Sequence, residues 1–152
     1  YKRMGYQKLS ISYFTIMREK KMPVLVMFID LDRLKYINDT FGHEYGDFAI
    51  VSIAKAMLKH CDADAIAART GGDEFIVLEG AKDEESGRVL AQKIRTELSK
   101  TQRAMQLPFD LSASIGVVVA HPGEENVLES YVKRAEMLMY EEKAEKKVSR
   151  DS

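Results

Sequence analysis

The chain has 152 residues, of which 23 are Lys or Arg and 24 are Asp or Glu, so its net charge is close to zero. This balance argues against binding to nucleic acid, which calls for a strongly basic surface. The single cysteine, Cys61, excludes an internal disulfide and agrees with a reducing compartment. No apolar run approaches the roughly 20 residues that span a bilayer. We therefore expect one cytoplasmic domain, and its first residue, Tyr1, suggests that it was excised from a longer chain.

The first part of the chain predicts one strand among helices. Residues 24–29 are apolar at both odd and even positions, as in a central strand that is covered on both faces. This strand ends abruptly in the charged segment Asp30-Leu31-Asp32. Apolar residues at helical spacing predict helices over residues 6–20, 33–40 and 46–60.

The stretch Ala65–Leu78 predicts a β-hairpin. Its two short limbs flank Gly71-Gly72, a pair able to take the positive φ angles of a two-residue turn. Asp73 and Glu74 follow at once. Carboxylates at a turn are either a solvated tip or ligands that hold a divalent metal on phosphate oxygens. The second acidic cluster, upstream at residues 30–32, favours the metal site.

The second part of the chain predicts a long strand between two helices. The first helix begins at residues 83–85, where acidic side chains complement the helix dipole. The strand covers Phe109–Ala120, and we expect a bulge at Gly116. The last helix covers Asn126–Lys146. This order of elements predicts an α+β fold, with a central, mostly antiparallel sheet flanked by helices in a ferredoxin-like arrangement.

The predicted topology brings the two acidic clusters together, with Asp73 and Glu74 facing Asp30 across neighbouring strands. Carboxylates this close repel one another, and their desolvation is costly unless a cation compensates. Mg²⁺ suits such a site because it takes one or two carboxylates and completes its octahedron with water and phosphate oxygens. The start of the short helix after Asp32 offers backbone N–H groups to a phosphate. Candidates for further phosphate neutralisation are Lys35, Arg69, Lys143 and Lys147.

Two segments of the chain resemble the GGDEF domain of bacterial diguanylate cyclases. They are Phe28–Asp47 (FIDLDRLKYINDTFGHEYGD) and Arg69–Leu78 (RTGGDEFIVL), with further support from Ser114–Val117 and Arg134–Glu136. The resemblance covers nearly the whole chain. It implies that residues 1–152 form a GGDEF domain with a nucleotidyl-cyclase palm-like fold, trimmed of the family's leading segment.

The resemblance also implies an activity and its partners. The family joins two GTP molecules into cyclic di-GMP and releases two pyrophosphates, with Mg²⁺ or Mn²⁺ as cofactor. Each domain holds one GTP, so turnover needs a homodimer, and an upstream sensor or regulatory domain in the same chain is expected. The alternative that stays open is a catalytically silent GGDEF domain, namely a regulatory module that binds GTP without synthesising cyclic di-GMP.

Individual roles are implied by the same resemblance. Asp30, Asp73 and the main-chain carbonyl of Leu31 match metal ligands. Glu74 matches either a further ligand or the group that helps to deprotonate the 3′-hydroxyl. Asn38 and Asp47 match guanine-reading positions. This makes physical sense because a carboxylate accepts hydrogen bonds from the N–H groups of guanine, and adenine lacks that donor pattern.

The basic candidates match positions of the same family. Lys143 and Lys147 match phosphate-contacting residues, although Lys147 stands where Arg is usual and so loses the planar fork. Arg69 matches the arginine before the hairpin, and Lys35 matches a motif lysine with either a phosphate-binding or a structural role. Many members carry an inhibitory Arg-x-x-Asp site for the product upstream of the hairpin. The matching stretch Asp62–Ala65 has no arginine, so we predict weak or absent product inhibition there.

Overall fold

The computed structural model describes residues 3–124 and 126–151. In these ranges four strands form one antiparallel sheet in the order β2-β3-β1-β4, which confirms the predicted α+β, ferredoxin-like arrangement. None of the helices described has both the length and the apolar character needed to cross a membrane. In chain order the elements are α1 (Arg3–Glu19), β1 (Val24–Leu31), α2 (Leu34–Phe41), α3 (His43–His60), β2 (Ile66–Arg69), β3 (Glu74–Gly80), α4 (Glu84–Ala104), β4 (Ala113–Ala120) and α5 (Leu128–Asp151).

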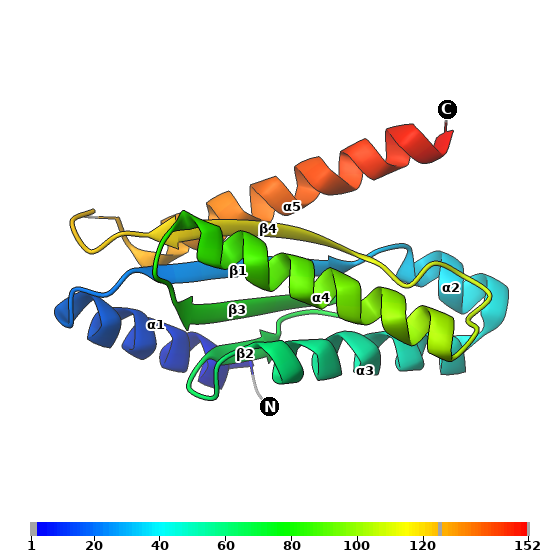
Figure 1. Ribbon diagram of the computed structural model, residues 1–152, viewed down its shortest axis with the longest axis horizontal. Helices are drawn as coiled ribbons and strands as arrows, with labels where there is room; N and C mark the ends of the chain where they lie inside the picture. The colour runs from blue at the N-terminus through cyan, green and yellow to red at the C-terminus, as the bar shows by residue number, and fades with distance from the viewer. Residues whose placement is uncertain (1–2, 125, 152) are drawn as a thin grey trace.

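Helices cover both faces of the sheet (Figure 1). The alternation of side chains along the buried strand β1 divides the core in two. Leu25, Met27 and Ile29 pack with residues of α3 and α4, whereas Val26 and Phe28 pack with residues of α1 and α5. Asp30 continues the even-numbered series, so its side chain lies on the face covered by α1 and α5.

The connection between β2 and β3 is not the predicted two-residue turn. Four residues, 70–73, link the strands, and the N–H of Thr70 donates to the carbonyl of Glu74 at 2.9 Å. Neither Gly71 nor Gly72 has a positive φ angle. The longer loop lets the carbonyl of Asp73 accept a hydrogen bond from the N–H of Leu31 at 2.9 Å. The hairpin loop is thereby joined to the end of β1.

The predicted bulge at Gly116 is also wrong, because the ladder between β1 and β4 runs without interruption. Gly116 instead allows α5 to lie close to the sheet. A Cβ atom there would come within 1.9 Å of the Ala135 carbonyl oxygen and 2.6 Å of the Met139 nitrogen. The strand starts at Ala113, later than predicted, because its partner Leu31 is the last residue of β1.

Candidate active site at the end of β1

Three carboxylates meet where β1 ends and β3 begins. Asp30 is directly opposite Glu74 in the ladder, so both side chains lie on the same face of the sheet. Asp73 joins them from the hairpin loop. One oxygen from each of the three groups lies within 4.8 Å of the others, a spacing that could hold a metal ion.

Asp30 is the buried member of this cluster, whereas Asp73 and Glu74 are partly exposed. Its side chain is buried, and its Oδ1 atom has no hydrogen-bond partner within the part of the chain that the structure describes. Burial raises the pKa of Asp30 to about 7, and the nearby Asp73 adds to this rise while Lys143 opposes it. A buried oxygen without a donor is costly, so the site fits a bound cation that would satisfy it.

Lys143 reaches this cluster from α5. Its Nζ atom donates to the main-chain carbonyl of Leu31 at 3.3 Å and lies 3.4 Å from Oδ2 of Asp30. The Leu31 carbonyl and the Asp30 carboxylate therefore converge on one positive charge, here an ammonium group. These are two of the groups that the family resemblance implies as metal ligands.

The chain turns sharply between β1 and α2. Arg33 takes a left-handed conformation, with φ 58° and ψ 38°, and provides no side-chain cap to the helix. A non-glycine residue in this region is uncommon and often marks a functional site. The guanidinium carbon of Arg33 lies 3.9 Å from the ring centre of Tyr36. With no capping side chain, the first N–H groups of α2 are suited to an anionic ligand.

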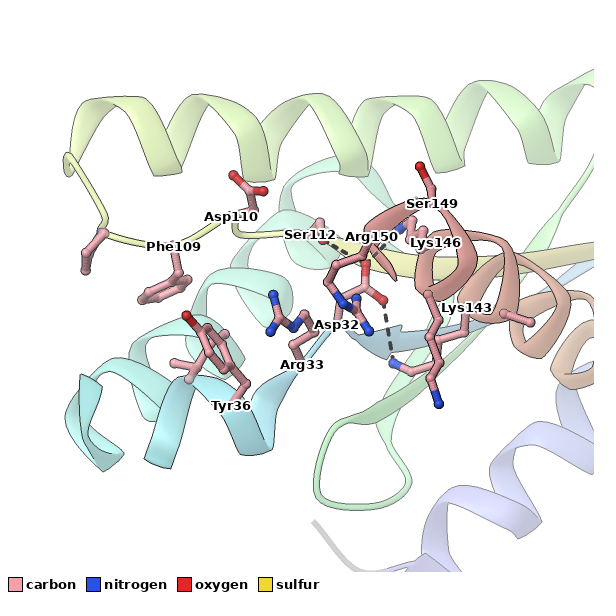
Figure 2. A pocket seen from close by; sticks show the side chains of 14 residues that line it. Asp32, Arg33, Tyr36, Phe109, Asp110, Ser112, Lys143, Lys146, Ser149 and Arg150 are labelled. Carbon is pink, nitrogen blue, oxygen red and sulfur yellow. Dashed lines mark hydrogen bonds and ion pairs between the residues drawn. The ribbon is translucent and has the colours of Figure 1, made fainter. Parts of the chain in front are cut away.

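A cavity of about 920 Å³ lies between α2, residues 108–112 and the C-terminal half of α5. It adjoins the carboxylate cluster, because Lys143 contributes to both. Figure 2 shows basic side chains from α5 and from the turn between β1 and α2 around it, with Tyr36 and Phe109 at one end. The basic residues that line the cavity are Arg33, Lys143, Lys146, Lys147 and Arg150. A polyanion could therefore bind beside the carboxylates.

Two of the predicted basic residues lie away from this cavity. Lys35 is turned to solvent, where its Nζ pairs with Oδ2 of Asp39 at 2.9 Å. Arg69 folds over the hairpin loop and donates from Nε to the carbonyls of Gly71 and Gly72 at 3.0 and 3.1 Å. Arg69 thus supports the loop that carries Asp73.

The two predicted guanine-reading residues lie where α2 and α3 meet. Asn38 packs against Gly46, since a Cβ atom on Gly46 would come within 1.8 Å of the Asn38 Oδ1 atom. Asp47 is the next residue of α3 and is exposed. The bare backbone at Gly46 therefore allows the Asn38 side chain to lie against α3 beside the residue that precedes Asp47.

Sequence reasoning assigned no role to Asp32, which is the most extensively bonded carboxylate of the site. It accepts hydrogen bonds from the hydroxyls of Ser112 and Ser114 and from Nζ of Lys146, each at 2.7 Å. The sequence does contain a signal for this role, namely the Asp-x-Asp spacing of residues 30–32 and the Ser-x-Ser spacing of residues 112–114. Residues two apart in a strand lie on the same face, so these side chains can meet at the ends of two adjacent strands.

The sequence model of the family described as "Diguanylate cyclase, GGDEF domain" matches residues 2–149. The chain belongs to the GGDEF family. This GGDEF domain is 34% identical over 134 residues to the diguanylate cyclase VdcA of Vibrio cholerae, a match covering 86% of the chain and 39% of VdcA. It is 32% identical over 118 residues to the bifunctional diguanylate cyclase/cyclic di-GMP phosphodiesterase MucR of Pseudomonas aeruginosa, covering 78% of the chain and 17% of MucR. The domain thus spans less than half the length of these relatives.

Solved structures share this fold. A sensory box/GGDEF family protein from Caulobacter crescentus aligns with a TM-score of 0.75 at 28% identity, covering 92% of the GGDEF domain and 90% of that chain. The GGDEF domain of DgcB from the same organism, solved in complex with c-di-GMP, aligns with a TM-score of 0.76 at 23% identity, covering 93% and 84%. The DgcB likeness supports the fold alone.

Proposed function

We propose that this GGDEF domain is a diguanylate cyclase, which condenses two GTP molecules into cyclic di-GMP and releases two pyrophosphates. One observation carries the proposal. The carboxylates of Asp30, Asp73 and Glu74 lie within 4.8 Å of one another, and one of them has a buried oxygen without a donor among the described residues. Such a group favours a cation, and the basic cavity beside it favours a polyphosphate.

In this proposal Asp30, Asp73, Glu74 and the carbonyl of Leu31 would hold Mg²⁺ or Mn²⁺. When bound, the metal supplies a Lewis acid that neutralises phosphate charge and lowers the pKa of the attacking 3′-hydroxyl. Glu74 serves either as a further ligand or as the acceptor of the hydroxyl proton. The ion is needed because the buried Oδ1 atom of Asp30 has no hydrogen-bond partner within the described chain.

The rest of the GTP molecule extends from this point in two directions. Lys143 and Lys147 contact the phosphates from α5, together with the backbone N–H groups at the start of α2. Asp47 accepts from the N–H groups of guanine, and Asn38 completes the base recognition. Lys35 is exposed and pairs with Asp39, which supports a structural role for it.

The reaction joins two such half-sites. The 3′-oxygen of one GTP attacks the α-phosphorus of the other, a new P–O bond forms, the bond to the β-phosphate oxygen breaks, and pyrophosphate leaves. The second attack closes the ring. Because each domain holds one GTP, turnover requires a homodimer. An upstream domain in the same chain would raise the local concentration of the two halves and could thereby regulate the enzyme.

Incubation of the full-length protein with GTP and Mg²⁺, followed by chromatographic detection of cyclic di-GMP, tests the proposal. We expect product from the parent and at most a trace from the Asp73→Ala variant, which serves as the matched control. Tight GTP binding by the full-length parent without any product would instead support a regulatory module that does not synthesise cyclic di-GMP.

A further inference from the structure

Asp32 is a buried carboxylate that the proposed reaction does not use. Its two oxygens accept three hydrogen bonds, from Ser112, Ser114 and Lys146. Burial alone would raise the pKa of Asp32, but these hydrogen bonds outweigh it and the pKa is lowered. Because its oxygens already have donors, Asp32 is poorly suited to bind a metal. Its contacts lie instead with the neighbouring strand and with α5.

The C-terminal half of α5 has little apolar packing to hold it. The buried residues of this helix are Tyr131, Ala135 and Met139, all in its first half, and its C-terminal end extends away from the sheet (Figure 1). Polar contacts replace the apolar ones in that half. Lys146 donates to Asp32 and to the carbonyl of Ala113, at 2.7 and 2.8 Å.

Lys143 and Lys146 lie three residues apart and therefore on the same side of the helix. Asp32 is close to both, with Oδ2 2.7 Å from Nζ of Lys146 and Oδ1 3.5 Å from Nζ of Lys143 (Figure 2). A second ion pair supports the same turn of α5, because Glu142 lies 3.2 Å from Lys146 and 2.6 Å from Arg95 of α4. The direction of Lys143 thus depends on how firmly this turn is attached.

We propose that Asp32 is a positioning residue, which binds Lys146 and so fixes the C-terminal half of α5 with Lys143 directed at the phosphates of GTP. This inference rests on the proposed function, because it takes Lys143 to be a phosphate-contacting group. It adds that the Asp32–Lys146 pair, which lines the same cavity, sets the strength of the phosphate contact that Lys143 makes.

The proposal is tested by nucleotide affinity, measured by calorimetry on the full-length protein with Mg²⁺ and the α,β-methylene analogue of GTP, which cannot release pyrophosphate. We expect Lys146→Met and Asp32→Asn to weaken binding roughly tenfold, as for misplacement of one charge-assisted hydrogen bond. The matched control is Lys133→Met, also on α5, whose exposed side chain pairs only with Glu129 among the described residues. It should bind like the parent.

A double-mutant cycle separates positioning from simple loss of stability. Lys143→Met should weaken binding roughly tenfold in the parent and have little further effect in Lys146→Met, because both changes remove the same contact. Hydrogen exchange of residues 140–151 should accelerate in Lys146→Met, while that of residues 131–139 should not change. Lys146 is half-buried and its loss leaves the core intact, so this variant serves if Asp32→Asn does not fold.

Unchanged affinity in Lys146→Met, additive effects of the two lysine variants, or unchanged exchange at the end of α5 would each overturn the positioning role. So would a parent that does not bind the analogue. A parent that binds the analogue, shows the coupling and yet makes no cyclic di-GMP from GTP would retain the positioning role while the proposed synthesis fails.

Discussion

Asp30 and Asp32 are two positions apart and are almost equally buried, with 5% and 7% of their surfaces exposed. Their pKa values are nevertheless shifted in opposite directions. The surroundings of Asp30 raise its pKa to about 7, whereas those of Asp32 lower its pKa. Both side chains contact Lys143. The difference lies in the other neighbours, which are carboxylates for Asp30 and hydrogen-bond donors for Asp32.

This contrast supports the proposal that Asp30 binds a ligand whereas Asp32 is structural. Asp32 has two hydroxyls and an ammonium to replace the water it lost on burial, so it stabilises the fold by itself. Asp30 lies beside Asp73 and opposite Glu74, so its charge is tolerated best when a cation is bound. Burial alone would not have separated the two roles.

The largest effect on activity is expected from a change in the carboxylate cluster of Asp30, Asp73 and Glu74. Asp73→Ala should lower cyclic di-GMP synthesis by roughly 100-fold or more, because a metal ligand supplies several kcal/mol of transition-state stabilisation. The fold should remain intact, since the change relieves repulsion between carboxylates. Product formation and a thermal melt measure the two parts, and an unfolded variant would contradict the assignment of Asp73 to metal binding.

Amide substitutions at the two aspartates should act on stability with opposite signs. Asp32→Asn should lower the free energy of unfolding by roughly 2–3 kcal/mol, because it leaves Lys146 and a buried hydroxyl poorly paired. Asp30→Asn should raise it in metal-free buffer by about 1 kcal/mol or less, because it removes a like charge opposite Glu74. Urea denaturation with and without Mg²⁺ measures both. Destabilisation by both variants would mean that the contrast has no energetic basis.

The comparison can be extended to an exposed carboxylate, Asp47. Asp47→Ala should reduce the preference for GTP over ATP roughly tenfold, since hydrogen bonds to a charged acceptor are lost on the guanine edge. Stability should hardly change because the side chain is exposed. Competition binding with the two nucleotides measures the ratio. Equal binding of ATP and GTP by the parent would exclude this assignment of the pocket.

The smallest effect concerns Glu79, a buried carboxylate at the opposite end of β3 from Glu74. Burial raises the pKa of Glu79, as do Asp62 and Asp64, while a hydrogen bond from the N–H of Asp62 opposes the rise. A carboxyl group with a raised pKa stabilises the fold below its unfolded-state pKa and loses that contribution as the pH rises. Glu79→Gln should therefore gain stability relative to the parent as the pH rises above the ordinary pKa of a glutamate side chain. A melting-temperature difference that does not grow with pH would contradict this.

Much of the fold could be predicted because its signals are local. The apolar run of β1, the turn residues of the hairpin and the helical spacings each reflect the environment of a single element. The meeting of Asp30 with Asp73 and Glu74 followed from antiparallel pairing of two strands. Asp32 was missed because its sequence context resembles that of Asp30, and only the packed structure shows which donors surround each carboxylate.

Other differences arose from contacts between elements. Gly116 was expected to form a bulge, but its lack of a side chain instead allows α5, a helix that follows later in the chain, to pack closely against β4. The hairpin loop was expected to be a tight turn, but it is longer, and the extra length allows the carbonyl of Asp73 to accept a hydrogen bond from the N–H of Leu31. Both features depend on partners that no local pattern identifies.

The residues that hold α5 also protect an open border of the sheet. β4 is the last strand on its side, and edge strands expose backbone groups that can pair with another molecule. Lys146 occupies the carbonyl of Ala113, and Glu142 accepts from the N–H of Ile115. The same salt-bridged turn that directs Lys143 therefore blocks part of this edge against intermolecular β-pairing, so that detachment of α5 would promote aggregation as well as weaken nucleotide binding.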